Sequence, residues 1–121
     1  MTDPTISHLD QPMPLSGRGN VIEDLINAIE TDTEDTLEHW TEATNSSPVA
    51  KAFDAVFEAA VLIAEELDLS LVEELSERDR VGFARYGTPL QYGNGRSSMV
   101  DLFQELLDGL VYSWQWRGEN A

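Results

Sequence analysis

Two groups of carboxylates in the C-terminal half of the chain have the spacing that a helical metal site requires. In an EExxE segment Glu74 and Glu77 are three residues apart, and in an ExxD segment Glu105 and Asp108 are three residues apart. Residues at this spacing lie on one side of an α-helix, so each pair can offer oxygen ligands to one hard cation. Magnesium held by carboxylates of two facing helices can bridge nucleotide phosphates and activate a water. The pattern predicts that these four residues are catalytic and bind Mg²⁺.

Asp101 extends the second pair, because Asp101, Glu105 and Asp108 are spaced four and three residues apart. On a helix they fall within roughly 60° of one another and form a single acidic stripe. An ordinary solvated face has the same appearance, because 23 acidic residues in 121 produce such spacings by chance. Both interpretations remain open on spacing alone.

Arginines are concentrated between the two acidic pairs. Arginine recognises phosphate oxygens with a bidentate fork, and Arg96 precedes a predicted helix start, whose free N–H groups also favour an anion. We therefore predict Arg85, Tyr86 and Arg96 as substrate-binding residues of a nucleotide site, with Tyr86 able to stack on a base. Alternatively, the arginines pair with neighbouring carboxylates. Four of the seven basic residues make up this concentration: Arg78, Arg80, Arg85 and Arg96.

The formal net charge of -16 bears on the class of partner. Phosphate backbones require clustered cations, so direct binding to nucleic acid is not expected. Three explanations compete: a strongly solvated surface, imitation of nucleic acid toward a basic partner, or carboxylates that hold a divalent cation. Adaptation to a salty cytoplasm also fits.

Other features of the composition bear on the kind of metal site and on the cellular location. The chain has no cysteine, and its two histidines, His8 and His39, are too far apart in sequence to suggest a metal site. It shows neither a signal peptide nor an apolar run long enough to span a membrane. A cytoplasmic protein without a membrane partner is expected.

The elements that must position these residues are predicted to form an all-α, four- to five-helix bundle, and further copies of the chain are expected as partners in a homo-oligomer. Residues 1–19 are rich in Pro, Ser, Thr and Gly and predict a flexible N-terminal arm, and residues 20–121 predict a single helical domain. Capping residues and apolar spacing predict four helix starts: after Asn20, at Pro48 with Ser47 as the cap, at Leu71 with Ser70 as the cap, and after Ser98. The last of these helices is predicted to end near Trp114. A weak additional helix is predicted within Thr31 to Thr44.

Several segments of the same region resemble known proteins. The RYGTPLQ, NGR and DLFQELLD segments, at 85–91, 94–96 and 101–108, resemble a block of small phage-encoded proteins. The EExxE and ExxD elements, within about Leu71 to Trp114, resemble the all-α nucleoside triphosphate pyrophosphohydrolases of the MazG-like and dimeric dUTPase group.

This resemblance implies a helical bundle, often a dimer or tetramer, that releases pyrophosphate from a nucleotide. Magnesium would be held by Glu74, Glu77, Glu105 and Asp108, with Glu73 as the extra acid of EExxE. A phage origin implies the host cytoplasm. The alternative is an acidic phage interaction protein that binds a basic host protein. Such a protein could act as a DNA mimic or an anti-defence factor.

Overall fold

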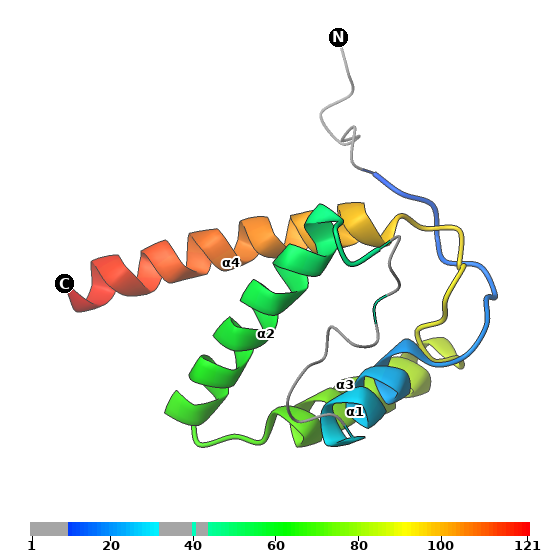
Figure 1. Ribbon diagram of the computed structural model, residues 1–121, viewed down its shortest axis with the longest axis horizontal. Coiled ribbons are helices and arrows are strands. Elements are labelled where there is room, and N and C mark those ends of the chain that lie inside the picture. The colour runs from blue at the N-terminus through cyan, green and yellow to red at the C-terminus, as the bar shows by residue number, and fades with distance from the viewer. Residues whose placement is uncertain (1–9, 32–39, 41–43) are drawn as a thin grey trace, which may run out of the picture. The chain divides into compact units, whose positions relative to one another are not determined.

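The structure, a computed structural model, describes residues 10–31, 40 and 44–121 (Figure 1). In this part of the chain the secondary structure consists of four helices and no strand, which confirms the all-α prediction. The predicted weak helix within Thr31 to Thr44 lies mostly outside the described residues. The helices are α1 (Val21–Thr31), α2 (Pro48–Glu66), α3 (Leu71–Tyr86) and α4 (Ser98–Asn120).

Local capping explains where the first three helices begin. The side chains of Asn20, Ser47 and Ser70 each accept a hydrogen bond from the backbone N–H three residues later, at 3.0, 3.2 and 3.2 Å. Each bond satisfies one of the free N–H groups of a first helical turn. These three predicted starts are confirmed.

The start and end of α4 differ from the prediction. Ser97, in an extended conformation, is the N-cap, and its Oγ accepts from Val100 N at 3.2 Å. Ser98, the predicted cap, is already the first helical residue. The helix also continues past Trp114 to Asn120, whose side chain donates to Trp116 O at 2.9 Å. No proline interrupts Gln115 to Asn120, so the hydrogen-bond ladder can continue.

The chain divides into two compact units. One unit spans Gly17–Tyr92 and holds the first three helices, and the other combines the residues before Gly17 with Gly93–Ala121, which contain α4. The predictions of an arm over 1–19 and a single domain over 20–121 stay predictions.

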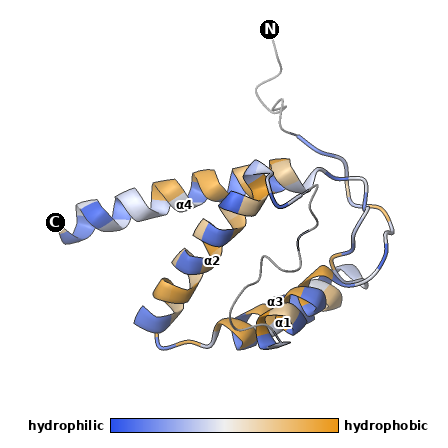
Figure 2. Ribbon diagram, in the orientation of Figure 1, coloured by the Kyte–Doolittle hydropathy of each residue, from blue (hydrophilic) through white to orange (hydrophobic). Residues whose placement is uncertain are grey.

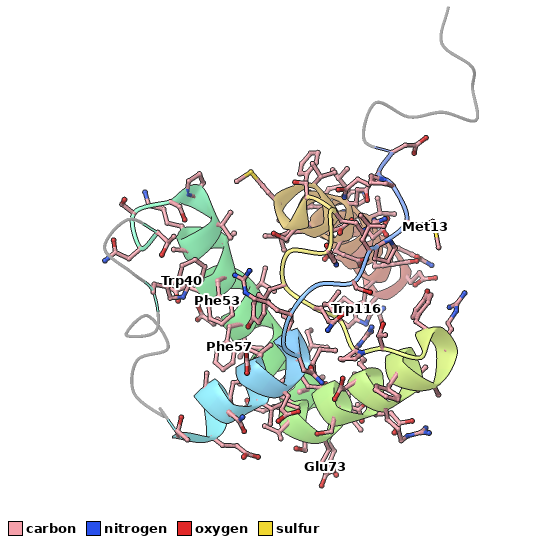
Figure 3. All side chains as sticks on the ribbon, turned by 90° about the vertical axis from the view of Figure 1, so that its right-hand side faces the viewer. Met13, Trp40, Phe53, Phe57, Glu73 and Trp116 are labelled. Atoms are coloured by element: carbon pink, nitrogen blue, oxygen red, sulfur yellow. The ribbon has the colours of Figure 1, made fainter. Side chains whose placement is uncertain are left out.

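Within the first unit, α1 lies against α3, and α2 also contacts α3 (Figure 1). The Asn20 side chain, which caps α1, also donates to both carboxylate oxygens of Asp79 on α3, at 3.1 and 3.3 Å. Figure 3 shows Trp40, Phe53 and Phe57 next to one another. Their ring centroids are 5.9 Å apart for each neighbouring pair, as aromatic packing requires. Phe53 and Phe57 therefore pack with Trp40 in an aromatic cluster.

Extended residues before α1 pair with the segment that follows α3. Arg18 N donates to Tyr92 O at 3.0 Å, and Tyr92 N donates to Arg18 O at 2.9 Å. Gly17 N adds a bond to the Gln91 side chain at 3.2 Å. This bridge fixes the RYGTPLQ segment to the beginning of the first unit.

Burial is low throughout the described residues, among which Ala50 alone is buried. Hydrophobic and hydrophilic residues alternate along α2 and α4 (Figure 2). In both helices, part of the apolar face remains exposed to solvent. No helix in the described ranges is both long and apolar enough to cross a membrane. Large apolar side chains are exposed along α4: Met99, Phe103, Leu107, Leu110, Val111, Tyr112, Trp114 and Trp116.

Candidate functional site

The first acidic pair lies on the N-terminal half of α3. Ser70 caps this helix, so Glu74 and Glu77 fall in its regular part and project from one side, as their spacing predicts. Both carboxylates are exposed. Glu73, the extra acid of EExxE, is exposed as well, and its backbone N–H is used in the cap. The local geometry of the pair is therefore regular and open to solvent.

Glu77 already has a cationic partner on its own helix. Arg80 Nε donates to Glu77 Oε2 at 3.0 Å, and a second bond joins Arg80 Nη2 to Oε1. The hydrogen bond from Arg80 lowers the pKa of Glu77 below 4.5 and the same bond raises the pKa of Arg80. A metal ion that uses Glu77 must compete with this exposed ion pair, whereas no described cation pairs with Glu74.

The second acidic pair lies in the middle of α4. Glu105 and Asp108 are exposed, and in the described chain neither makes a hydrogen bond or an ion pair. Asp101, the third member of the predicted stripe, is instead bound by Arg96. The open part of the stripe is therefore the ExxD pair alone.

Arg96 is engaged at three positions of its guanidinium group. Nε and Nη2 donate to the two Asp101 oxygens at 3.2 and 2.7 Å, and Nη1 donates to Pro12 O at 2.7 Å. The bond to Asp101 raises the pKa of Arg96, which keeps the guanidinium charged. Its side chain is 27% exposed. These contacts fix the start of α4 to the residues near Pro12 and leave a limited part of the fork for phosphate.

Sequence reasoning missed Gln11, which completes this arrangement. Its Nε2 donates to Asp101 Oδ1 at 2.6 Å and to Ser97 O at 3.1 Å, and its Oε1 accepts from Ser97 N. Gln11 therefore makes hydrogen bonds to both Ser97, the N-cap of α4, and Asp101 in its first turn. No local signal predicts a contact between residues 86 positions apart.

The other predicted substrate-binding residues lie at the C-terminal end of α3. The Arg85 guanidinium lies 5.3 Å from the centroid of the Tyr86 ring, within cation–π range. Both side chains are exposed. Gly87, at φ 76°, ends the helix in the left-handed conformation that suits glycine. Arg85 and Tyr86 therefore form an exposed cation and ring that no carboxylate in the described chain neutralises.

Tyr92 has a structural role in the segment that follows α3. Its ring edge lies 3.4 Å from where a Cβ on Gly19 would be, so it covers this glycine. Partial burial, followed by a hydrogen bond to Asp24, raises the pKa of Tyr92 above 10. Tyr92 therefore holds the bridge to Arg18 on one side and packs on Gly19 on the other.

The four predicted metal ligands are divided between the two units. Glu74 and Glu77 belong to the unit that contains α3, and Glu105 and Asp108 belong to the unit that contains α4. Within the described residues, no three His, Asp or Glu side chains come together as a ready metal centre. Each pair by itself offers two carboxylate groups, so full coordination would also require water or the phosphates of a ligand.

Comparison with known proteins gives no relative: the chain matches no protein-family model, no curated protein and no solved structure.

Proposed function

We propose that the protein is a MazG-like nucleotide-binding protein that acts as a magnesium-dependent nucleoside triphosphate pyrophosphohydrolase. The observation that carries this proposal is the open ExxD pair on α4, where Glu105 and Asp108 are exposed and, among the described residues, unpaired. Arg96 binds Asp101 of the same stripe and leaves these two acids without a described cationic partner, so they are available to an external cation.

Each residue has a defined role in this proposal. Glu105 and Asp108 hold Mg²⁺ from α4, and Glu74 and Glu77 are the second proposed carboxylate pair, on α3. Magnesium, when bound, neutralises charge on the phosphate oxygens. The reaction adds water across the bond between the α-phosphorus and its bridging oxygen, and it yields a nucleoside monophosphate and pyrophosphate.

Substrate binding uses the cation and ring at the end of α3. Arg85 is the residue proposed to contact phosphate, because the fork geometry of arginine matches phosphate oxygens and no described carboxylate neutralises it. Tyr86 offers an exposed ring. Arg96 contacts substrate only with the part of its fork that Asp101 and Pro12 leave free.

The direct test is pyrophosphate release from a mixture of nucleoside triphosphates with Mg²⁺. We expect turnover by the native chain and at least a tenfold loss in Glu105→Gln and Asp108→Asn, because each removes a charged ligand. Glu119→Gln is a matched control, since Glu119 lies on the same helix about 21 Å from Glu105. No turnover by the native chain, together with no magnesium-dependent rise in melting temperature, would refute the proposal.

A thermal comparison separates specific metal binding from screening of the large negative charge. Salt shortens the Debye length from about 10 Å at 0.1 M to about 3 Å at 1 M, so NaCl alone stabilises a highly charged chain. Millimolar MgCl₂ should raise the melting temperature more than NaCl of equal ionic strength, and Asp108→Asn should remove that difference. Equal shifts for both salts would assign the effect to screening.

We also propose that the protein is a homo-oligomer. The α4 helix exposes a continuous apolar face that includes Phe103, Leu107 and Leu110, and exposed apolar patches of this extent mark interaction sites. Leu110→Asp should shift the native chain to a smaller species in sedimentation experiments. A monomeric native chain at micromolar concentration would contradict this part of the proposal.

The acidic interaction protein is the second candidate function, and one observation favours it. The hairpin formed by the end of α2 and the start of α3 exposes seven acids without a basic residue between Glu58 and Glu77. Such a surface fits a basic host protein and should bind it with a steep salt dependence.

Glu65→Gln with Glu66→Gln should weaken capture of nucleic-acid-binding proteins from host lysate, with Glu119→Gln as the control. Failure to capture any such protein at low salt argues against this function. The acids are Glu58, Glu65, Glu66, Asp68, Glu73, Glu74 and Glu77.

A further inference from the structure

The segment between α3 and α4 contains an asparagine followed directly by a glycine. Asn94 and Gly95 form the one Asn-Gly pair among the five asparagines of the sequence. The amide carbon of an asparagine side chain can be attacked by the backbone nitrogen of the next residue, and a side chain on that residue hinders the attack. Glycine has no side chain, so its nitrogen is the most accessible nucleophile for this reaction. The pair is therefore a reactive position, and the proposed nucleotide chemistry does not use it.

The local structure of this pair favours the attack. Asn94 Oδ1 accepts from Arg96 N at 3.1 Å, so the Asn94 side chain folds back over the peptide group of Gly95. Negative charge develops on this oxygen when the nitrogen attacks, and the N–H group that already points at it stabilises that charge. In the described part of the chain the Gly95 N–H forms no backbone hydrogen bond, so its deprotonation breaks none. Gly95 is exposed, and hydroxide and water can reach it.

The other asparagines do not share this arrangement. Asn20 donates its NH₂ group to both carboxylate oxygens of Asp79, at 3.1 and 3.3 Å. The nitrogen next to it belongs to Val21, which is β-branched and donates its N–H to Leu90 O at 2.9 Å. The remaining asparagines also precede a residue that has a side chain: Asn27, Asn45 and Asn120. Reaction is therefore expected first at Asn94.

We propose that Asn94 is a site of intramolecular deamidation, which converts it to aspartate and isoaspartate. Gly95 N loses its proton and bonds to Asn94 Cγ, the bond from Cγ to Nδ2 breaks, and Nδ2 leaves with a proton as ammonia. The product is a cyclic imide. Water then opens the ring at Cγ to give aspartate, or at the backbone carbon to give isoaspartate. The reaction consumes water alone and involves no change of oxidation state.

The modification changes how residues 12–15 are held. Leu15 N donates to Asn94 O at 2.8 Å, and Arg96 Nη1 donates to Pro12 O at 2.7 Å. In isoaspartate the main chain runs through Cγ and gains one carbon, and the former Asn94 carbonyl becomes part of a free carboxylate. The two contacts then lose their common register. Deamidation therefore loosens residues 12–15 from the start of α4 and adds a negative charge to a chain of net charge -16.

The test follows the full native chain at mildly alkaline pH by peptide mapping with mass spectrometry, which separates asparagine, aspartate and isoaspartate. We expect position 94 to convert faster than Asn20 and Asn45, at a rate that rises with pH because the attacking nitrogen must lose its proton. Conversion at position 94 that is no faster than at Asn45 would overturn the proposal. This result is independent of pyrophosphate release, so the proposed function can fail while the deamidation site stands, and the reverse.

Two matched variants test the need for glycine after Asn94. Gly95→Ala places a Cβ beside the attacking nitrogen and should slow conversion at least about tenfold. Gly93→Ala is the control, because Gly93 and Gly95 both have positive φ, 65° and 82°, and alanine introduces similar strain at either position. Equal rates in the two variants would assign the loss to strain and overturn the role of Gly95. The native chain should also convert at least as fast as the chain unfolded in urea, and a slower native rate would overturn the role of Arg96 N.

Amide hydrogen exchange measures the effect on residues 12–15. The Leu15 N–H should exchange about fivefold faster in the chain that carries isoaspartate, as loss of one hydrogen bond predicts. The Glu73 N–H, which is bonded to Ser70 Oγ in the cap of α3, should exchange at an unchanged rate. Equal exchange of the Leu15 N–H before and after modification would overturn the loosening.

Discussion

Replacement of Gly17 by alanine tests the bridge that attaches the start of the first unit to the RYGTPLQ segment. A Cβ on Gly17 would lie 2.0 Å from Tyr92 O, and real Cβ contacts essentially never fall below 3.0 Å. The oxygen must therefore retreat by at least about 1 Å (3.0 - 2.0), which separates the paired backbones. Three hydrogen bonds depend on this approach: Gly17 N to the Gln91 side chain, Arg18 N to Tyr92 O, and Tyr92 N to Arg18 O.

Loss of these bonds sets the expected magnitude. At about 0.5 to 1.5 kcal/mol for each hydrogen bond, Gly17→Ala should lower the free energy of unfolding by about 1.5 to 4.5 kcal/mol. This is a large part of the roughly 5 to 15 kcal/mol that stabilises a typical domain. Urea unfolding followed by circular dichroism measures the change, and a constant slope shows that the compactness of both states is preserved.

Gly82 provides the matched control, because it lies inside α3 and a Cβ there would meet nothing within 4 Å. Alanine favours helix over glycine, so Gly82→Ala should raise the free energy of unfolding by about 0.5 to 1 kcal/mol. If Gly17→Ala unfolds within about 0.5 kcal/mol of the native chain, which is the range of neutral surface changes, the bridge does not hold the segment.

Three further predictions concern the cap of α4 and two titrating side chains. Ser97→Ala should cost about 1 kcal/mol in urea unfolding, because it removes the N-cap, whereas Ser98→Ala should be close to neutral. The pKa of Glu77 is lowered, so the stability it contributes is present above pH 4.5 and is lost as pH falls through the lowered value. Carboxyl NMR should show Glu77 titrating below 4.5, and Arg80→Gln should move it back toward 4.5; an unchanged midpoint would refute the ion pair. The pKa of Tyr92 is raised, so stability should fall as pH rises past 10; ultraviolet titration should show one late tyrosine that Tyr92→Phe removes.

Local chemistry made the helix starts predictable from sequence. Ser47 with Pro48, and Ser70 with the acids after it, need only a side-chain oxygen and a free N–H within one turn. The same reasoning selected Ser98 in place of Ser97, because two adjacent serines offer the same oxygen and only the backbone conformation of Ser97 decides between them.

Long-range contacts could not be predicted in this way. Arg96 was expected either to bind phosphate or to pair with an acid, and the partners it uses are Asp101 and the Pro12 carbonyl, 84 residues away. Spacing in the sequence carries no information on such a contact, since the folding of two distant segments creates it. The predicted metal ligands show the same limit: Glu105 and Asp108 share a stripe because of helix geometry, but no local rule relates them to the pair on α3.

The distribution of charge along α4 connects the two proposals about the protein. Two copies that each carry a net charge of -16 repel one another. Residues 109–118 are the part of α4 without an acid, and they contain one cation, Arg117. Association is therefore least opposed along this half of the helix, where Leu110 and Trp114 are exposed. The carboxylates that are proposed to hold magnesium lie on the opposite side of the same helix. A substitution on the apolar face should thus change assembly more than metal affinity. A substitution at Asp108 should change metal affinity more than assembly.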